Sequence, residues 1–160
     1  MLTESEVIAS VCCFLKKNRF RVTRFLSETE HGIDIQALAP DGKTKVSIEA
    51  KGETSSMSHT NRYGRVFSSS QVMDHVAKAV YCAARDVSAG LLAGVALPKN
   101  QRHVDCVQKI LRALKKLRIE VFWVLPHKKV EIEHIWGLWD TRAATATKTR
   151  RRATPTRLRP

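Results

Sequence analysis

The sequence lacks several features that would assign it to a class at once. None of its apolar runs approaches the ~20 residues that a membrane-spanning helix needs, and its start, MLTESE, has no basic flank before an apolar stretch. We therefore expect no membrane span, no signal peptide and a cytoplasmic protein. The cysteines show neither CxxC nor Cys/His ligand spacing, which argues against a zinc site or a disulfide framework. We expect reduced, mostly buried thiols at Cys12, Cys13, Cys82 and Cys106.

Acidic residues are also scarce relative to basic ones. The 160 residues contain 28 Lys and Arg against 15 Asp and Glu, a net charge of +13, which favours a polyanionic partner. Seven of the basic residues lie in the last 20 positions, together with two prolines, one leucine and no acid, a composition that does not build a packed core. We expect one folded domain over residues 1–140, with 21 basic and 15 acidic residues, and a disordered basic tail over residues 141–160.

Hydrophobic periodicity predicts the elements of this domain. Apolar residues at helical spacing follow a capping box at Thr3 and Glu6, and a second helix begins behind the serines at 68–70. Alternating or continuous apolar runs predict strands, and Pro40 to Lys43 supplies a hairpin turn. The predicted order is a helix at 4–17, strands at 20–26, 33–37 and 45–50, a helix to about 86, a strand at 91–97, a helix marked by residues 104–114, a strand at 119–125 and a possible edge strand at 130–135. This αβββαβαβ order predicts an α/β fold with a mixed sheet flanked by helices.

The hairpin turn fixes the register of the strands beside it. A turn centred on Asp41-Gly42 pairs Ala39 with Thr44, whether it has two or four residues. In that register Asp34 lies opposite Glu49 on one face of the hairpin, and Lys51 points the same way two residues on. The other face is wholly apolar and must look into the core: Ile33 opposite Ala50, Ile35 opposite Ile48, and Ala37 opposite Val46.

Two carboxylates that face each other across a strand pair destabilise it unless a cation lies between them. Mg²⁺ would serve, with one or two carboxylate ligands and its other positions left for water and phosphate. Lys51 beside such a metal could position or deprotonate the attacking water, or neutralise charge on the phosphate. Phosphodiester hydrolysis is the chemistry that this arrangement favours, and a solvated hairpin face with Glu/Lys pairing is the structural alternative.

His31-Gly-Ile-Asp-Ile35 followed by Ser47-Ile-Glu-Ala-Lys-Gly52 resembles the PD-(D/E)XK nuclease superfamily, whose restriction-endonuclease-like core is αβββαβ. The resemblance covers about residues 3–125. It implies that Asp34 and Glu49 are metal ligands, that the carbonyl of Ala50 adds a ligand, and that Lys51 is the catalytic lysine. The cofactor implied is Mg²⁺, with Mn²⁺ as a substitute. Two departures are Ile33 where many members have proline, and the long insertion over residues 53–70.

Members similar to Mrr-type restriction enzymes and Holliday-junction resolvases also place a glutamate near the start of the first helix and a glutamine early in the helix after the third strand. Glu6 and Gln71 match those positions, although Glu6 is also explained by its capping box and Gln71 by a place in a first helical turn. His75 and Lys78 share a helix face with Gln71 and could meet a substrate backbone, or simply belong to a solvated helix face. From the insertion, Arg62, Tyr63 and Arg65 could hold nucleic acid over the metal, or belong to a mobile polar loop.

These residues lead to one main hypothesis, a Mg²⁺-dependent endonuclease that hydrolyses phosphodiester bonds in DNA. An alternative is a non-catalytic module that binds nucleic acid on the same fold, and a third is a subunit or effector that needs a partner for activity. The sequence leaves RNA open as a substrate. Cleavage of both DNA strands would favour a homodimer.

Overall fold

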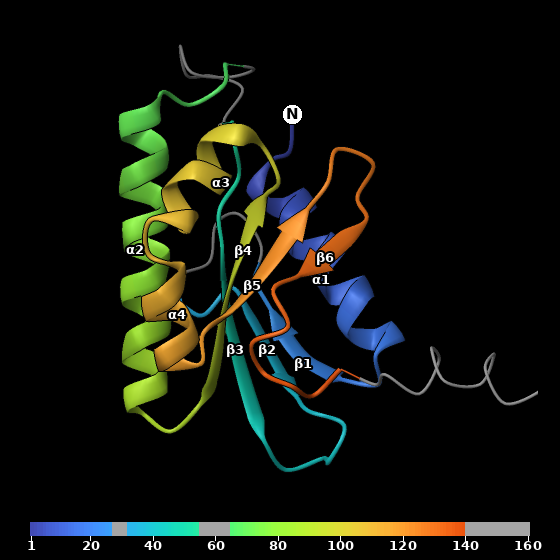
Figure 1. The fold of residues 1–160 in the computed structure, drawn as a ribbon. Helices are drawn as coiled ribbons and strands as arrows, with labels where there is room; N and C mark the ends of the chain where they lie inside the picture. The colour runs from blue at the N-terminus through green and yellow to red at the C-terminus, as the bar shows by residue number, and fades with distance from the viewer. Residues whose placement is uncertain (27–31, 55–64, 140–160) are drawn as a thin grey trace, which may run out of the picture.

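The computed structural model describes residues 1–26, 32–54 and 65–139 of the chain. These residues form one mixed sheet with helices on both faces, as the sequence predicts (Figure 1). The expected basic tail at 141–160 lies outside the described residues. No helix in the described ranges is long and apolar enough to cross a membrane.

Six strands of the described chain lie in the sheet in their chain order: β1 (Arg21–Phe25), β2 (Ile35–Leu38), β3 (Lys45–Ala50), β4 (Leu92–Pro98), β5 (Glu120–Val124) and β6 (Val130–Ile132). The pairs β1–β2, β2–β3 and β5–β6 are antiparallel, whereas β3–β4 and β4–β5 are parallel. The parallel pairs sit in the middle of the sheet because each is joined by a helical crossover that covers it.

The hairpin register predicted from the turn is confirmed. Ile35 pairs with Ile48 and Ala37 with Val46. The turn is the four-residue form, since the N–H of Ala39 donates to the carbonyl of Thr44, and Gly42 supplies the positive φ of 71° that the turn requires. The apolar face of the hairpin is therefore committed to the core, and the face that carries Glu49 is turned to the other side of the sheet.

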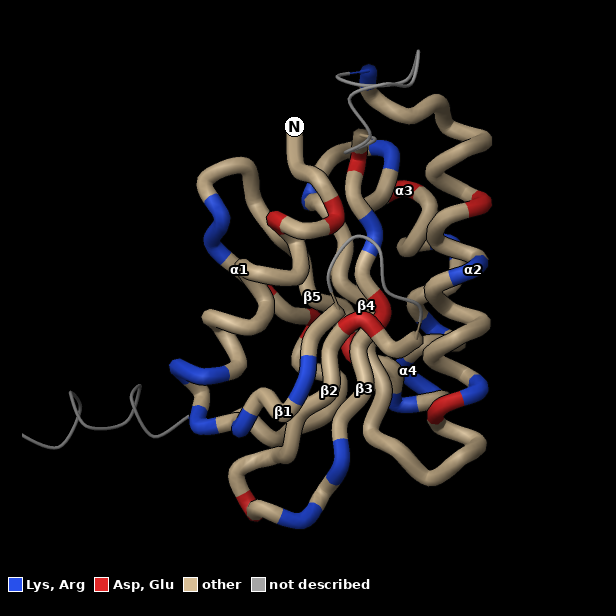
Figure 2. The backbone as a smooth tube through the Cα atoms, turned by 180° about the vertical axis from the view of Figure 1, so that it is seen from behind, with Lys and Arg blue, Asp and Glu red and all other residues tan. Residues whose placement is uncertain are grey.

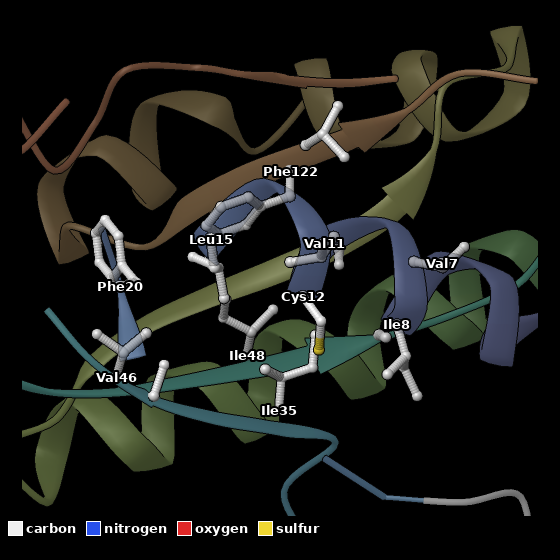
Figure 3. Close-up of a cluster of buried hydrophobic side chains, with 14 of the residues drawn as sticks. Val7, Ile8, Val11, Cys12, Leu15, Phe20, Ile35, Val46, Ile48 and Phe122 are labelled. Carbon is white, nitrogen blue, oxygen red and sulfur yellow. The ribbon is translucent and has the colours of Figure 1, made fainter. Parts of the chain in front are cut away.

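Helix α1 (Glu4–Lys17) covers the apolar face of the hairpin. Its capping box is complete, with the Thr3 hydroxyl accepting from the N–H of Glu6 and the Glu6 carboxylate accepting from the N–H of Thr3. Figure 3 shows the side chains of this helix packed over β2, β3 and β5. The buried contacts come from Val7, Ile8, Val11, Cys12 and Leu15 on the helix and from Ile35, Val46, Ile48 and Phe122 on the strands.

Helix α2 (Ser69–Ser88) covers the opposite face of the sheet. Ser68 caps it, as expected from the serines at 68–70, and Val72, Val76, Ala79 and Ala83 form its buried stripe. This stripe packs on Ala93, Val95 and Leu97, while Ala96 of the same strand faces α1. Strand β4 is thus buried on both faces, which is why its sequence is almost continuously apolar.

The prediction of a single helix around residues 104–114 is wrong, because two helices form there. The chain forms α3 (Gln101–Gln108) and α4 (Leu111–Leu117), separated by a turn at Lys109 and Ile110. Ile110 has φ −117° and ψ 1°, which is not helical, and its side chain packs against the same cluster as Val107 and Leu114. Apolar spacing continues across the break because both helices bury their side chains on one layer, so periodicity alone does not reveal it.

The chain after β6 is held by a buried carboxylate. Glu120, at the start of β5, accepts hydrogen bonds from the backbone N–H groups of Ile135 and Trp136 and from the indole of Trp139. Trp136 and Trp139 stack with ring centroids 5.7 Å apart. Trp136 and Trp139 therefore close the core. The edge strand ends at Ile132, earlier than predicted, and the bonds from Glu120 hold the chain beyond it.

The cysteines are free, as predicted, but the expectation that most are buried is wrong. Only Cys12 is buried, Cys82 and Cys106 are half-buried, and Cys13 is exposed. Cys12 and Cys13 are neighbours on α1, where successive side chains point about 100° apart, so both cannot face the core.

Candidate functional site

The polar face of the β2–β3 hairpin brings two carboxylates together. The register that pairs Ile35 with Ile48 puts Asp34, immediately before β2, across from Glu49 on β3. Asp34 is only 8% exposed, and its Oδ2 accepts a 2.7 Å hydrogen bond from the backbone N–H of Ala50. The carboxylates lie on the α2 side of the sheet, because Ile48 and Ala50 occupy the α1 side. Figure 2 shows a group of acidic positions near the middle of the sheet.

The ammonium group of Lys51 lies at the centre of this site. Its Nζ is 2.9 Å from Oε1 of Glu49, 3.6 Å from Oδ2 of Asp34 and 3.4 Å from Oε2 of Glu4. The same ammonium donates to the backbone carbonyl of Ala50. Lys51 is 9% exposed, so four oxygens surround a largely buried positive charge. We call Glu4, Asp34, Glu49 and Lys51 the acid cluster.

Glu4 is the residue of the acid cluster that sequence reasoning missed. The chain beyond β3 runs against the start of α1, where the N–H of Glu53 donates to the carbonyl of Leu2. A Cβ at Gly52 would lie 2.7 Å from the backbone nitrogen of Glu4, so only glycine allows this approach. The signal in the sequence was the glycine that directly follows the Glu-x-Lys strand, together with a first helical turn that offers Glu4 as well as Glu6.

The structure does not bring Glu6 to the acid cluster. Its carboxylate accepts from the N–H of Thr3 at 3.0 Å and forms a 3.2 Å ion pair with Lys128. The cap and the nearby ammonium lower the pKa of Glu6. Two residues along a helix point about 200° apart, so Glu4 and Glu6 cannot both face Lys51.

Helix α2 borders the acid cluster on its far side. His75 and Lys78 lie on α2, and the charge of Lys51 acts on His75 as that of Lys78 acts on Glu49. The Phe67 ring packs edge-on against His75, with centroids 4.6 Å apart. Burial, followed by the nearby Lys51 ammonium, lowers the pKa of His75. The cluster therefore has a neutral imidazole and the exposed Lys78 on this wall.

Gln71 lies at the start of this helix and completes its capping box. Its side-chain oxygen accepts from the N–H of Ser68 at 2.9 Å, and its own N–H donates to the Ser68 hydroxyl. This is the structural role that the sequence left as an alternative. Of the residues predicted from the insertion, Arg65 is exposed ahead of α2, whereas Arg62 and Tyr63 lie outside the described residues.

The protonation of the acid cluster follows from burial and mutual charge. Burial raises the pKa of Glu4 and of Glu49, and the neighbouring Asp34 adds to this rise, while the Lys51 ammonium opposes it. Burial by itself would lower the pKa of Lys51, but the three carboxylates outweigh it and raise that pKa above its usual value. The site thus attracts cations strongly and holds its lysine protonated.

The donor set can be tested for a divalent metal. Within the described ranges, no three His, Cys, Asp or Glu side chains stand close enough together to hold a metal ion. The carboxylates are instead spread around the ammonium at 2.9–3.6 Å, whereas Mg²⁺ needs oxygens at about 2.0–2.1 Å. The donors are nonetheless all hard oxygens that converge on one cation, which is the chemistry Mg²⁺ prefers. As the side chains lie here, the carboxylates are arranged around the Lys51 ammonium and do not by themselves form a metal site.

Comparison of the chain with models of protein families, with curated proteins and with solved structures finds no match.

Proposed function

We propose that this protein is a metal-dependent endonuclease that hydrolyses phosphodiester bonds in DNA. The observation that carries the proposal is the convergence of Glu4, Asp34, Glu49 and the Ala50 carbonyl on the ammonium of Lys51. Three carboxylates around one buried cation serve a structural ion pair poorly, because the two that remain after pairing repel each other. They serve a doubly charged metal well.

Asp34, Glu49 and the Ala50 carbonyl would hold Mg²⁺, with Mn²⁺ as a substitute, and Glu4 would complete the negative charge around it. When bound, the metal polarises the phosphate and makes its coordinated water more acidic. The Oδ2 of Asp34 accepts from the N–H of Ala50, which fixes the carboxylate, and Oδ1 would coordinate the metal. This bond is the kind of outer contact that keeps a metal ligand oriented.

Lys51 would act beside the metal rather than in its place. Its raised pKa keeps it protonated at neutral pH, which suits an ammonium that neutralises charge on the phosphate or orients the attacking water. It suits a general base poorly. Burial and the charge of Lys51 lower the pKa of His75, so a neutral imidazole lies on the α2 side of the site.

The element order supports a finer proposal about the fold. One helix, an antiparallel β1–β2–β3 set, a helical crossover and the parallel strand β4 make up αβββαβ, with an acid at the start of β2 and Glu49-x-Lys51 at the end of β3. This resembles the restriction-endonuclease-like core of the PD-(D/E)XK superfamily. Membership in that superfamily is part of our proposal, as is a homodimer that would cut both strands.

The proposal is tested by incubating the purified chain with supercoiled plasmid and Mg²⁺ or Mn²⁺. We expect nicked and linear products, blocked by a chelator and reduced at least about 100-fold in Glu49→Gln and in Lys51→Met. Glu131→Gln is the matched control, since Glu131 is an exposed acid that pairs with Lys99 on the protein surface. Calorimetry should detect a divalent-metal site in the parent that Glu49→Gln loses.

The outcome that would refute the proposal is also clear. If no DNA form is cleaved with either metal, or if Lys51→Met cleaves as well as the parent, the acid cluster is not a nuclease site. A non-catalytic binding module would then remain, and its affinity for DNA would be indifferent to Asp34→Asn.

A further inference from the structure

The sheet face that carries the acid cluster continues onto β1 and β2. Helix α2 packs against β3 and β4 on this side. The side chains of Gln36 and Leu38 on β2 remain half-buried, and those of Arg21, Thr23 and Arg24 on β1 are exposed. In the described part of the chain, this end of the sheet therefore has a face that no helix seals.

The basic side chains of β1 are directed to this open face by the alternation of the strand. Phe20 and Val22 pack with the α1 core, so Arg21 between them faces the other way. A register shift between Val22 and Arg24 pairs Arg24 with Gln36. Arg24 therefore lies on the open face and not on the α1 side, where Val22 lies. Such a bulge re-aims a side chain, and here it puts a second arginine on the open face.

A third basic residue completes a row across the strands. Arg21 pairs with Leu38, and Leu38 pairs with Lys45, so Arg21 and Lys45 flank β2 on the same face. Counting along the strands at ~3.3 Å per residue, Arg24 lies ~7 Å and the Arg21–Lys45 row ~13 Å from the level of Asp34 and Glu49. Figure 2 shows Lys and Arg positions along β1 and the β2–β3 hairpin, below the acidic positions.

The acidic and basic side chains of this face are separated along the strands. On strands β1 to β3 the carboxylates lie at one end of this face and the cations toward the other, at distances that span several phosphates of a nucleic-acid strand. The face also lacks the apolar side chains of a protein interface core, since Leu38 is its one aliphatic residue among the described positions Arg21, Thr23, Arg24, Gln36, Leu38 and Lys45.

We infer that Arg21, Arg24 and Lys45 form a second contact surface, which binds the phosphate backbone of duplex DNA on one side of the bond to be cut. The inference rests on the proposed function for its choice of DNA. It assigns the substrate a direction: the duplex leaves the acid cluster along β1 and the hairpin, so a short duplex that ends at the cluster is bound weakly.

The experiment measures binding without cleavage. The Glu49→Gln chain is titrated with a duplex of about 24 base pairs and with one of about 8 base pairs across a salt series. The same is done after adding the triple substitution Arg21→Ala, Arg24→Ala and Lys45→Ala. We expect at least a 10-fold loss of affinity for the long duplex and a shallower salt dependence, by about 2 to 3 in the slope of log K against log salt, because each phosphate contact contributes about 0.9.

A matched triple substitution controls for net charge. Lys109, Arg112 and Lys116 are exposed on or beside α3 and α4, and their replacement by alanine removes the same three charges. We expect a change of less than threefold in that variant. Both variants keep residues 141–160, so the seven basic residues there contribute equally to all affinities.

Equal losses in the two triple variants would overturn the inference, as would a loss seen only with double-stranded RNA. The result is separable from the proposed function, because cleavage is assayed with the parent. A parent that cleaves DNA while the triple variant binds normally refutes the surface alone. A parent that never cleaves, with binding lost only in the triple variant, refutes the nuclease and leaves the DNA surface.

Discussion

Asp34 Oδ2 accepts a 2.7 Å hydrogen bond from the backbone N–H of Ala50, so the first carboxylate of the site is held by the strand that carries the second. Asp34 and Ala50 are both buried. The Asp34 side chain therefore has two roles: it ties the end of β2 to β3, and it holds a negative charge in the site. Substitution can separate these roles.

Asp34→Ala and Asp34→Asn should differ in stability but agree in activity. Alanine leaves the buried N–H of Ala50 without its acceptor, which costs about 1–3 kcal/mol, whereas asparagine keeps a carbonyl oxygen there and costs less. Both remove the charge, and we expect both to abolish metal binding and cleavage. Urea denaturation and calorimetry measure the two effects. Equal stability of the two variants would show that the hydrogen bond contributes nothing.

Replacing Lys51 by methionine should leave three carboxylates without their cation. We expect a loss on the order of 3 kcal/mol at pH 7, as for breaking a buried pair. The pKa values of Glu4 and Glu49, already raised by burial, should rise further. A carboxyl with a raised pKa destabilises the fold at high pH, and the penalty is relieved as pH falls toward its ordinary value of 4.5.

The same variant tests whether the ammonium and a metal ion compete for the same carboxylates. The amount by which the Tm of Lys51→Met lies below that of the parent should be smaller at pH 5 than at pH 7. Added Mg²⁺ should raise the Tm of the variant more than that of the parent. A larger Mg²⁺ effect on the parent would contradict competition between the ammonium and the metal.

Glu4→Gln and Glu6→Gln form a matched pair on one helical turn. Glu4 contacts Lys51 at 3.4 Å, whereas Glu6 caps the helix and pairs with Lys128. We expect Glu4→Gln to lower metal affinity and cleavage about 10- to 100-fold. Glu6→Gln should leave cleavage within about threefold and cost about 0.5–1 kcal/mol of stability through the cap. The reverse ranking would assign the site role to Glu6.

Gly52→Ala should act on the site without touching a charge. Its Cβ would lie 2.7 Å from the Glu4 nitrogen and 2.9 Å from the Thr3 carbonyl carbon, so the start of α1 must move away. We expect a stability loss of about 1–3 kcal/mol and a cleavage defect that Glu4→Gln does not deepen. Gly42→Ala controls for lost stability alone: its φ of 71° makes alanine unfavourable there, but nothing lies within 4 Å of a Cβ, so we expect cleavage to be unchanged. Independent, additive cleavage defects would contradict the coupling.

Protonation of His103 should make the stability of the fold depend on pH. It is fully buried, and burial lowers its pKa to about 4 from the ordinary 6.5. Because the unfolded chain binds the proton first, stability falls as pH decreases from about 6.5 to about 4, by up to about 3 kcal/mol. His103→Gln should flatten this part of the pH profile, and His127→Gln, at an exposed position, should not. Identical profiles would show that His103 does not titrate in this range.

Local rules were sufficient for much of the fold. Several features depend only on side chains a few residues apart, so their sequence patterns indicate the structure directly. They are the capping boxes at Thr3 and Ser68, the hairpin register and the burial of β4 on both faces. The break between α3 and α4 was not visible, because both halves bury apolar residues on the same layer.

The sequence by itself determined that Asp34, Glu49 and Lys51 share one face, since a turn of known length and a side-chain period of two leave no other register. Only the tertiary structure decided that Glu4, and not Glu6, joins them. That choice depends on how closely α1 approaches the end of β3, and Gly52 permits the approach across 48 residues of chain. Contacts between distant segments are set by packing, which local patterns do not encode.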